Sequence, residues 1–217
     1  MNRVFIKICG ITCLEDAQMA VAAGADALGF NFWTGSPRHI APQDAATITA
    51  KLGANTVKIG VFVDSNAVET TEIVRVAGLD LAQIHGSVPP LTVHFWQAFS
   101  AAPGLEDQLR AALAASRAEA FLIDTPAGAQ RGGTGRAFDW RLVRGLPGRI
   151  VLAGGLGPDN VAQAIREARP WGVDACSRLE RAPGRKDPAQ VGAFIQAVRA
   201  AELQHIQEDD DEAEHAH

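Results

Sequence analysis

The stretch Val4-Phe5-Ile6-Lys7-Ile8-Cys9-Gly10 is a short apolar run that stops at a cysteine and a glycine. Its β-branched and aromatic residues are typical of a strand. A helix-like segment follows, in which Thr12 stands three residues before Glu15, the spacing of a capping box. Cys9 is therefore expected where a strand ends and a helix is about to begin. In parallel sheets, ligands bind at that edge.

The thiol of Cys9 has two interpretations at this point. A cysteine at such an edge is a candidate nucleophile or base. Cysteine is also among the most buried residue types, so Cys9 could simply pack in the core. Its position alone does not decide between the two.

Outward from this stretch, strand-like and helix-like segments alternate. The strand-like runs are residues 3–9, 26–33, 56–63, 80–84, 93–99, 120–123, 149–153 and 172–176, and the helix-like runs are residues 14–23, 43–52, 67–77, 105–115, 139–144, 160–168 and 188–203. This alternation predicts right-handed βαβ units and a parallel sheet. Eight such units that close on themselves form a (β/α)8 TIM barrel. The alternative is an open doubly wound sheet, but the first strand lacks the GxGxxG motif of its dinucleotide-binding version.

We expect a single α/β domain, a barrel over residues 1–204, because no stretch has the composition of an interdomain linker. An acidic run follows from Glu208 to Glu214, with Ala213 as its one apolar residue. Such a run has almost no apolar surface to bury. Residues 205–217 are therefore predicted to form a disordered tail.

Composition and charge exclude several classes of protein. At 217 residues, with 47% hydrophobic and 21% charged residues, the chain is typical of a globular protein with a full core. No apolar run approaches the ~20 residues of a membrane span, and no signal-peptide pattern is seen, so we expect a cytoplasmic protein without a membrane partner. The net charge of −5 argues against a nucleic-acid partner.

The cysteines also limit the chemistry. Cys9, Cys13 and Cys176 are too few for a disulfide scaffold. They lack the CxxC spacing and clustered histidines of a zinc site, so no metal is expected. A reducing compartment is the default for such a chain.

In a TIM barrel the chemistry lies at the C-terminal ends of the strands, so the residues that follow each predicted strand are the candidates. They include Cys9, Arg38, Asp64, His85, Asp124, the pair Gly154-Gly155 and the run Cys176-Ser177-Arg178. A thiol, a carboxylic acid, an imidazole, a guanidinium and two loops of small residues are thus predicted to converge on one rim.

Two places on this rim have the chemistry of anion sites. Gly154-Gly155 and Ser177 follow the seventh and eighth strands, whose loops often bind phosphate in this fold. The alternative is that both are ordinary tight turns. Arg38 offers a bidentate fork for a carboxylate if it points inward, and is otherwise a surface charge. Together they indicate a small-molecule substrate with phosphate at one end and carboxylate at the other.

Cys9 and Asp124 are candidates for general acid–base catalysis. A thiolate can take a proton from carbon while a protonated aspartic acid gives one to an oxygen. Nearby cations would lower the pKa of the thiol, and an apolar setting would raise the pKa of the carboxyl. The alternative for Asp124 is helix capping or an ion pair with Arg131 or Arg136.

Taken in order, the sequence fragments resemble the phosphoribosylanthranilate isomerase family. The resemblance runs along nearly the whole chain up to Asp187. The fragments are KICGIT (7–12), ALGF (27–30), SPR (36–38), VFVD (61–64), QIHG (83–86), DT (124–125), GGTG (132–135), FDW (138–140), AGGL (153–156), PDN (158–160), GVD (172–174), Glu180, PG (183–184) and KD (186–187).

The resemblance implies a (β/α)8 barrel that uses no cofactor or metal. The implied reaction is the Amadori rearrangement of N-(5-phosphoribosyl)anthranilate to 1-(2-carboxyphenylamino)-1-deoxyribulose 5-phosphate, a step of tryptophan biosynthesis. By the family pattern, Asp124 protonates the ring oxygen, Cys9 removes the proton from ribose C2, and Arg38 holds the carboxylate. The loops at Gly154-Gly155 and Ser177 hold the phosphate. The expected substrate-binding set is completed by His85, Gly133, Asp174 and Arg178, and the expected assembly is a monomer or homodimer.

The chain departs from the family pattern at two places. Where the family usually reads Asp-Val-Ser-Ser-Gly-Val-Glu, this chain reads Asp174-Ala-Cys-Ser-Arg-Leu-Glu180. Arg178 replaces a glycine and either adds a charge to the phosphate site or points outward, and Cys176 replaces a serine. The second departure, at Asn31 and Thr34-Gly35, is expected to alter packing over the anthranilate ring.

Two rival functions remain open at this stage. One is a related phosphosugar isomerase of histidine synthesis, but that family uses two aspartates at comparable positions, so Cys9 argues against it. The other is a phosphometabolite-binding barrel that has lost catalysis through Arg178.

Overall fold

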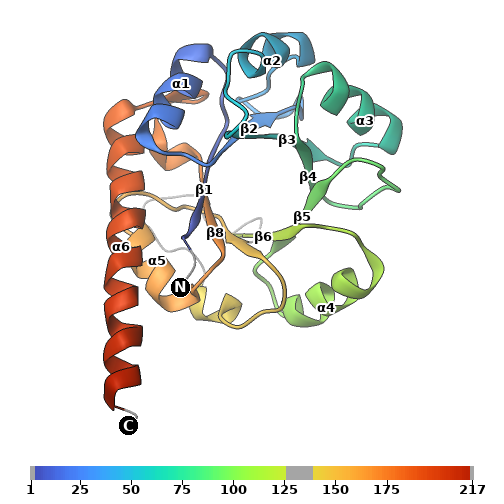
Figure 1. Ribbon diagram of the computed structural model, residues 1–217. Coiled ribbons are helices and arrows are strands. Elements are labelled where there is room, and N and C mark those ends of the chain that lie inside the picture. The colour runs from blue at the N-terminus through green and yellow to red at the C-terminus, as the bar shows by residue number, and fades with distance from the viewer. Residues whose placement is uncertain (1–2, 126–138, 216–217) are drawn as a thin grey trace.

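The computed structural model describes residues 3–125 and 139–215, with side chains as far as residue 203. Eight parallel strands close into a barrel in the order β1 to β8, with helices around the outside (Figure 1). Each strand pairs with the next along the chain, and β1 also pairs with β8. This closure confirms the predicted (β/α)8 barrel and excludes the open sheet.

The elements have the following bounds. The barrel strands are β1 (Phe5–Cys9), β2 (Ala27–Asn31), β3 (Val57–Val63), β4 (Leu81–His85), β5 (Phe95–Ser100), β6 (Ala120–Asp124), β7 (Ile150–Leu152) and β8 (Gly172–Ala175). The helices are α1 (Leu14–Ala23), α2 (Pro42–Thr49), α3 (Ala67–Val76), α4 (Leu105–Ala115), α5 (Val161–Ala168) and α6 (Pro188–His215), with short 3-10 helices η1 (Trp140–Val143) and η2 (Ser177–Leu179). A small hairpin of β9 (Glu180–Ala182) and β10 (Arg185–Lys186) lies between η2 and α6.

The alternation of side chains along each strand divides the apolar residues into two layers. Along β1, Ile6 and Ile8 face outward and pack in the core between barrel and helices. Phe5 faces inward and packs against the apolar cluster inside the barrel, which includes Trp96 and Leu122. Because the residues of β1 alternate, Lys7 and Cys9 share the inward face with Phe5.

Aromatic rings fill the N-terminal end of the barrel interior. The ring centroids of Phe5 and Trp171 lie 4.7 Å apart, and those of Phe5 and Trp96 lie 5.8 Å apart. From the N-terminal to the C-terminal end of β1, the inward-facing residues are Phe5, Lys7 and Cys9. The polar residues are thus raised to the C-terminal end of the barrel.

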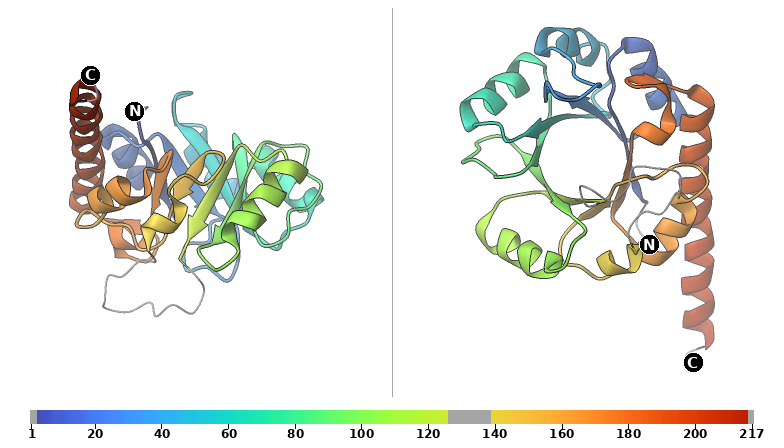
Figure 2. Two further views of the ribbon diagram at one scale, coloured as in Figure 1. Left: turned by 90° about the horizontal axis from the view of Figure 1, so that it is seen from below. Right: turned by 180° about the vertical axis from the view of Figure 1, so that it is seen from behind.

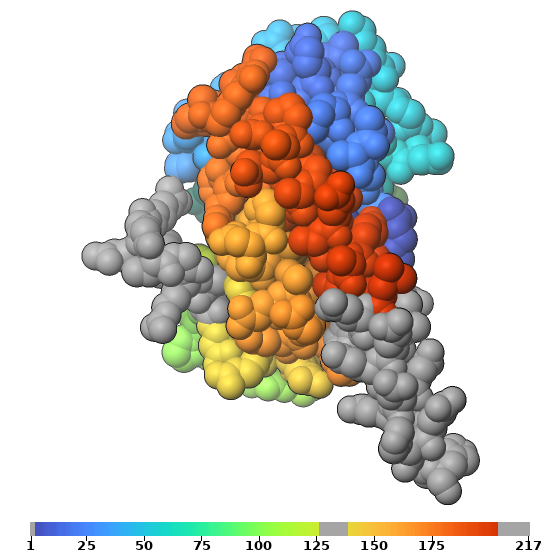
Figure 3. Space-filling view, turned by 90° about the vertical axis from the view of Figure 1, so that its left-hand side faces the viewer, coloured from blue at the N-terminus to red at the C-terminus, as the bar shows by residue number. Residues whose placement is uncertain are grey.

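Helix α6 runs along the outside of the barrel beside α1 and α5 (Figure 3). Its C-terminal part extends past the barrel (Figures 1 and 2). It continues to His215, beyond the helix end that the sequence predicts at Leu203. The chain between these residues has neither glycine nor proline, so no strong helix breaker interrupts it. The predicted division into a barrel (1–204) and a disordered tail (205–217) stays a prediction. In the described part of the chain, no helix is both long and apolar enough to cross a membrane.

Thr12 does not form the predicted capping box. The N-cap of α1 is Cys13, whose side chain makes no capping hydrogen bond. The hydroxyl of Thr12 instead donates to the carbonyl of Gly184 at 2.5 Å, in the turn of the β9–β10 hairpin. A tertiary partner has replaced the local one, and Thr12 ties the start of α1 to the hairpin.

Candidate active site

The predicted site residues lie at the C-terminal ends of their strands. Cys9 ends β1, His85 ends β4 and Asp124 ends β6. Going round the barrel from β6 through β7 and β8 to β1, Asp124 and Cys9 are three strands apart. The barrel therefore places the thiol and the carboxyl at well separated positions on one rim.

A buried ion pair lies directly beneath Cys9. Lys7 Nζ is 2.8 Å from Asp174 Oδ1, and the side chain of Lys7 is fully buried. The register of β1 and β8 pairs these residues across the ladder. Burial alone would lower the pKa of Lys7, but the negative charges of Asp174 and Cys9 raise it, so the lysine stays charged.

The environment of Cys9 favours its thiolate. A hydrogen bond from the Cys176 side chain lowers the pKa of the Cys9 thiol, and the charges of Lys7 and Lys186 lower it further. Burial and the charge of Asp174 oppose this change, and the net result is a pKa of about 7 against an ordinary value of 9.0. The thiol of Cys9 therefore loses its proton more readily than an ordinary cysteine does.

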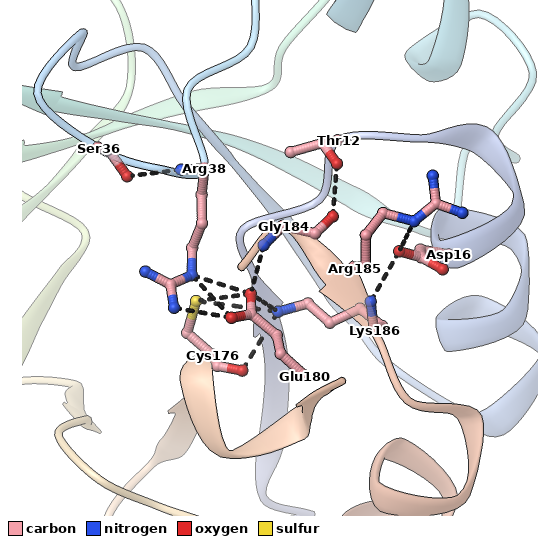
Figure 4. Close-up of polar contacts among 9 residues, drawn as sticks. All are labelled: Thr12, Asp16, Ser36, Arg38, Cys176, Glu180, Gly184, Arg185 and Lys186. Carbon is pink, nitrogen blue, oxygen red and sulfur yellow. Dashed lines mark hydrogen bonds and ion pairs between the residues drawn. The ribbon is translucent and has the colours of Figure 1, made fainter. Parts of the chain in front are cut away.

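A second group of charged side chains is centred on Glu180 (Figure 4), and one of them, Lys186, lies close enough to affect Cys9. Arg38 Nε donates to Glu180 Oε1 at 2.9 Å and Arg38 Nη2 donates to Oε2 at 2.7 Å, a bidentate pair. Lys186 Nζ, fully buried, donates to Oε1 at 2.9 Å. Burial alone would raise the pKa of Glu180, but Arg38 and Lys186 lower it, so the carboxylate is ionised. Glu180 thus fixes Arg38 at the rim.

Gly10 has no side chain, and the space beside it is occupied by the side chains of Arg38 and Cys176. A Cβ on Gly10 would lie 2.8 Å from Arg38 Cδ and 2.9 Å from Cys176 Sγ, and the residue has a φ of 78°. Any larger residue would be strained and would displace both side chains. Gly29 in β2 makes room for Cys9 in the same way, since a Cβ added at Gly29 would lie 2.7 Å from Cys9 Sγ.

Asp124 is packed against the loop that follows β7. Its Oδ1 accepts a hydrogen bond from Thr125 N at 2.7 Å. A Cβ on Gly154, where φ is 87°, would lie 2.7 Å from that same oxygen and 2.6 Å from Thr125 N. The sequence predicts that Gly154 lets a ligand approach the backbone closely. The structure adds a second reason for a glycine there, because a side chain at this position would collide with Asp124. Gly133 and the proposed partners Arg131 and Arg136 lie outside the described residues.

The loops that follow β7 and β8 are joined by Arg178. Its Nη1 donates to the carbonyl of Gly155 at 3.3 Å, and its Nη2 donates to Asp159 Oδ2 at 2.8 Å. A Cβ on Gly155 would meet nothing within 4 Å, so this side of the loop is open. Ser177 lies at the start of η2, next to Arg178. Arg178 therefore reaches from η2 to the β7 loop, where its guanidinium is paired with Asp159.

His85 lies at the end of β4 with its Nε2 2.8 Å from the amide nitrogen of Gln83. Burial lowers the pKa of His85, and the charge of Lys7 lowers it further. The ring is therefore neutral near pH 7 and can accept the hydrogen bond from Gln83. Its side chain belongs to the barrel interior, above the Lys7–Asp174 pair.

The sequence prediction gives no chemical role to four residues of this site, although it expects Cys176 on the rim: Lys7, Cys176, Glu180 and Lys186. Lys7 has a signal in the sequence, because a lysine at an inward position of an apolar strand needs a buried partner. The other three come together through the β8 loop and the β9–β10 hairpin, whose strands are too short to show a pattern.

Metal-binding clusters and cavities are the other features to consider among the described residues. Among these residues, no group of three or more His, Cys, Asp or Glu side chains is placed to hold a metal ion. A cavity of about 190 Å³ lies beyond the ends of β2 and β3, lined by residues such as Phe32, Trp33 and Asp64. Asp64 is the residue that the sequence places after the third strand, whereas Cys9, Arg38 and Asp124 do not line this cavity.

Similarity to known proteins extends over the whole barrel. The family model described as N-(5'phosphoribosyl)anthranilate (PRA) isomerase matches residues 6–197. A relative from Solibacter usitatus named N-(5'-phosphoribosyl)anthranilate isomerase is 46% identical over 204 residues, covering 91% of this chain and 98% of its own.

Solved structures agree with the sequence comparison. One is a phosphoribosyl anthranilate isomerase in complex with reduced 1-(o-carboxyphenylamino)-1-deoxyribulose 5-phosphate, at a TM-score of 0.79 and 33% identity, covering 91% of this chain and 99% of the other. Another holds monomers generated from the dimeric isomerase of Thermotoga maritima, at a TM-score of 0.78, 34% identity and the same coverage. The chain therefore belongs to the N-(5'-phosphoribosyl)anthranilate isomerase family of tryptophan biosynthesis.

Proposed function

We propose that this chain converts N-(5'-phosphoribosyl)anthranilate to 1-(2-carboxyphenylamino)-1-deoxyribulose 5-phosphate with Cys9 as general base and Asp124 as general acid. The observation that carries the proposal is the position of Cys9, which lies on the same rim as Asp124 and directly above the buried charge of Lys7. These surroundings lower the pKa of its thiol toward neutrality. A base whose pKa lies near the working pH is effective in proton transfer from carbon.

In the proposed reaction, Asp124 gives its proton to the ring oxygen of the ribose. The C1–O bond breaks and the nitrogen lone pair forms a Schiff base at C1. The Cys9 thiolate then takes the proton from C2, and the electron pair of the C–H bond moves toward the nitrogen to give an enolamine. Tautomerisation of the enolamine yields the ketone. The three-strand separation of the two groups allows them to act at different atoms of one substrate.

The two ends of the substrate match the two anion sites. We assign the carboxylate of the anthranilate ring to Arg38, whose Nε and Nη2 are held by Glu180 while Nη1 points away from that carboxylate (Figure 4). We assign the phosphate to the loops at Gly154-Gly155 and Ser177, with Arg178 as an additional cation. The compound bound by the related isomerase carries a carboxyphenyl group and a phosphate.

The remaining predicted residues complete the proposal. His85 and Asp174 line the interior beneath the substrate, and Gly133 lies outside the described residues. A cytoplasmic location stays an expectation. For assembly we propose a monomer or homodimer, since a related isomerase is described as dimeric.

Removal of either catalytic group should nearly abolish turnover. We expect Cys9→Ala and Asp124→Asn to lower kcat by ~10²–10⁴-fold, the usual contribution of a positioned acid or base. The loss of anthranilate fluorescence on turnover measures the rate. Cys13→Ala is the matched control, a thiol four residues along that should change kcat by no more than about twofold. A fully active Cys9→Ala enzyme would rule out the assigned mechanism.

The pH dependence should follow the Cys9 thiol. Because the base acts as the thiolate, kcat/KM should fall about tenfold per pH unit on the acid side of the pKa. The midpoint of this acid limb should lie at an apparent pKa of about 7. The measurement is a pH series at substrate concentrations well below KM. An acid limb centred near 9.0, the ordinary value for a thiol, would contradict the assignment of Cys9.

Arg178 should contribute to phosphate binding. We expect Arg178→Ala to raise KM by about tenfold with little change in kcat, since a charge-assisted hydrogen bond is worth ~1.5–3 kcal/mol. The control is Arg110→Ala, which removes an exposed arginine that is also paired with a carboxylate, Glu106. Equal KM values for the two variants would mean that Arg178 serves the β7 loop through Asp159 and not the substrate.

A further inference from the structure

We propose that Cys176 is a positioning residue that holds Cys9 as a thiolate by donating its S–H hydrogen to Cys9 Sγ. This inference rests on the proposed role of Cys9 as the base, which gives the thiolate its use. It adds to that role a second thiol, which follows the end of β8.

The ladder of β1 and β8 brings the two thiols together. Ile8 pairs with Ala175, so the next residues, Cys9 and Cys176, are neighbours across the end of the barrel. The two thiols lie close enough for each to change the pKa of the other. Cys176 Sγ lies 2.9 Å from the point where a Cβ of Gly10 would stand, so the absence of a side chain at Gly10 makes room for the contact.

The single S–H hydrogen of Cys176 has two possible acceptors. One is Glu180 Oε1, 3.8 Å from Cys176 Sγ. That oxygen already accepts hydrogen bonds from Arg38 Nε at 2.9 Å and Lys186 Nζ at 2.9 Å, which are stronger donors. The other acceptor is Cys9 Sγ. Because Glu180 Oε1 already accepts two stronger hydrogen bonds, Cys9 Sγ is the better acceptor for the S–H group of Cys176.

The surrounding charges decide which thiol ionises. Cys9 is affected by Lys7, Lys186 and Arg38, which favour its anion, and by Asp174, which opposes it. Cys176 is affected by Lys186 and Arg38, but its hydrogen bond to Cys9 and its burial raise its pKa well above the ordinary range. One sulfur therefore keeps its proton and the other loses it. None of the four charged side chains is altered when Cys176 is replaced, so the donor can be tested alone.

The test is the pH dependence of Cys9 alkylation by iodoacetamide, followed peptide by peptide with mass spectrometry in the full chain. In the wild type the midpoint should lie at about 7. In Cys176→Ala, which has no donor, the midpoint should rise toward 9.0. Labelling at acidic pH should then slow by roughly tenfold for every pH unit that the midpoint rises, because only the thiolate reacts. Cys176→Ser restores a donor and should bring the midpoint most of the way back. An unchanged midpoint in Cys176→Ala would overturn the proposal.

A reciprocal variant keeps the test valid should Cys176→Ala fold poorly. Cys9→Ala removes the acceptor, so the pKa of Cys176 should fall and its labelling at alkaline pH should become several-fold faster than in the wild type. Equal labelling of Cys176 with and without Cys9 would contradict the hydrogen bond. Cys13→Ala is the control in both experiments, and thermal melting confirms that each variant is folded.

The kinetic arm separates this proposal from the proposed function. If Cys9 is the base, the acid limb of kcat/KM should move in Cys176→Ala by the same amount as the alkylation midpoint, and Cys176→Ser should reverse it. A changed midpoint with an unchanged kinetic profile would support the hydrogen bond from Cys176. The same result would contradict the assignment of Cys9 as the base in the proposed function.

Discussion

The ion pair between Lys7 and Asp174, buried inside the barrel beneath Cys9, is the interaction on which the site depends. Each of these two charges costs several kcal/mol to remove from water, and their contact at 2.8 Å offsets that cost. Replacing them by apolar residues would make a simpler core, so their value to the molecule lies elsewhere. Lys7 places a fixed positive charge below the thiol, and Asp174 keeps that charge from being lost on burial. The parallel register of β1 and β8 makes the pairing possible, and the closed barrel holds it in place.

The charged side chains around the Cys9 thiol carry one net positive charge. The pair beneath is neutral, while the group beside it has two cations, Arg38 and Lys186, against one carboxylate, Glu180. Three positive and two negative charges leave one positive charge, which matches one thiolate at Cys9. Asp124 lies three strands away, against the glycine loop that follows β7. The barrel thus separates a positive half, where a base is stabilised as its anion, from a second half in which a carboxyl has a different environment. Such separation is what lets two groups of one rim serve as acid and base.

Local periodicity in the sequence predicts the barrel, whereas contacts between distant parts of the chain escape it. The alternation of strands and helices leads to the fold, and the position of Cys9 and Asp124 at strand ends places them on one rim. The capping box predicted for Thr12 is wrong because Gly184, far along the chain, offers its hydroxyl a partner that no local pattern reveals. The β9–β10 hairpin escapes prediction for a related reason, since strands of three and two residues carry no periodicity. Glu180 and Lys186 belong to the family resemblance, but their contact with Arg38 follows only from the folded chain.

In the proposed mechanism, one substrate lies between these two halves, with its sugar C2 at Cys9. The most direct measurement is a crystal structure of this chain with reduced 1-(o-carboxyphenylamino)-1-deoxyribulose 5-phosphate, the compound bound by the related isomerase. We predict the carboxylate on Arg38, the phosphate between Gly155 and Ser177, and C2 within about 3.5 Å of Cys9 Sγ, the separation expected of reacting atoms. A ligand bound in the opposite direction, or with C2 out of reach of Cys9, would contradict the mechanism.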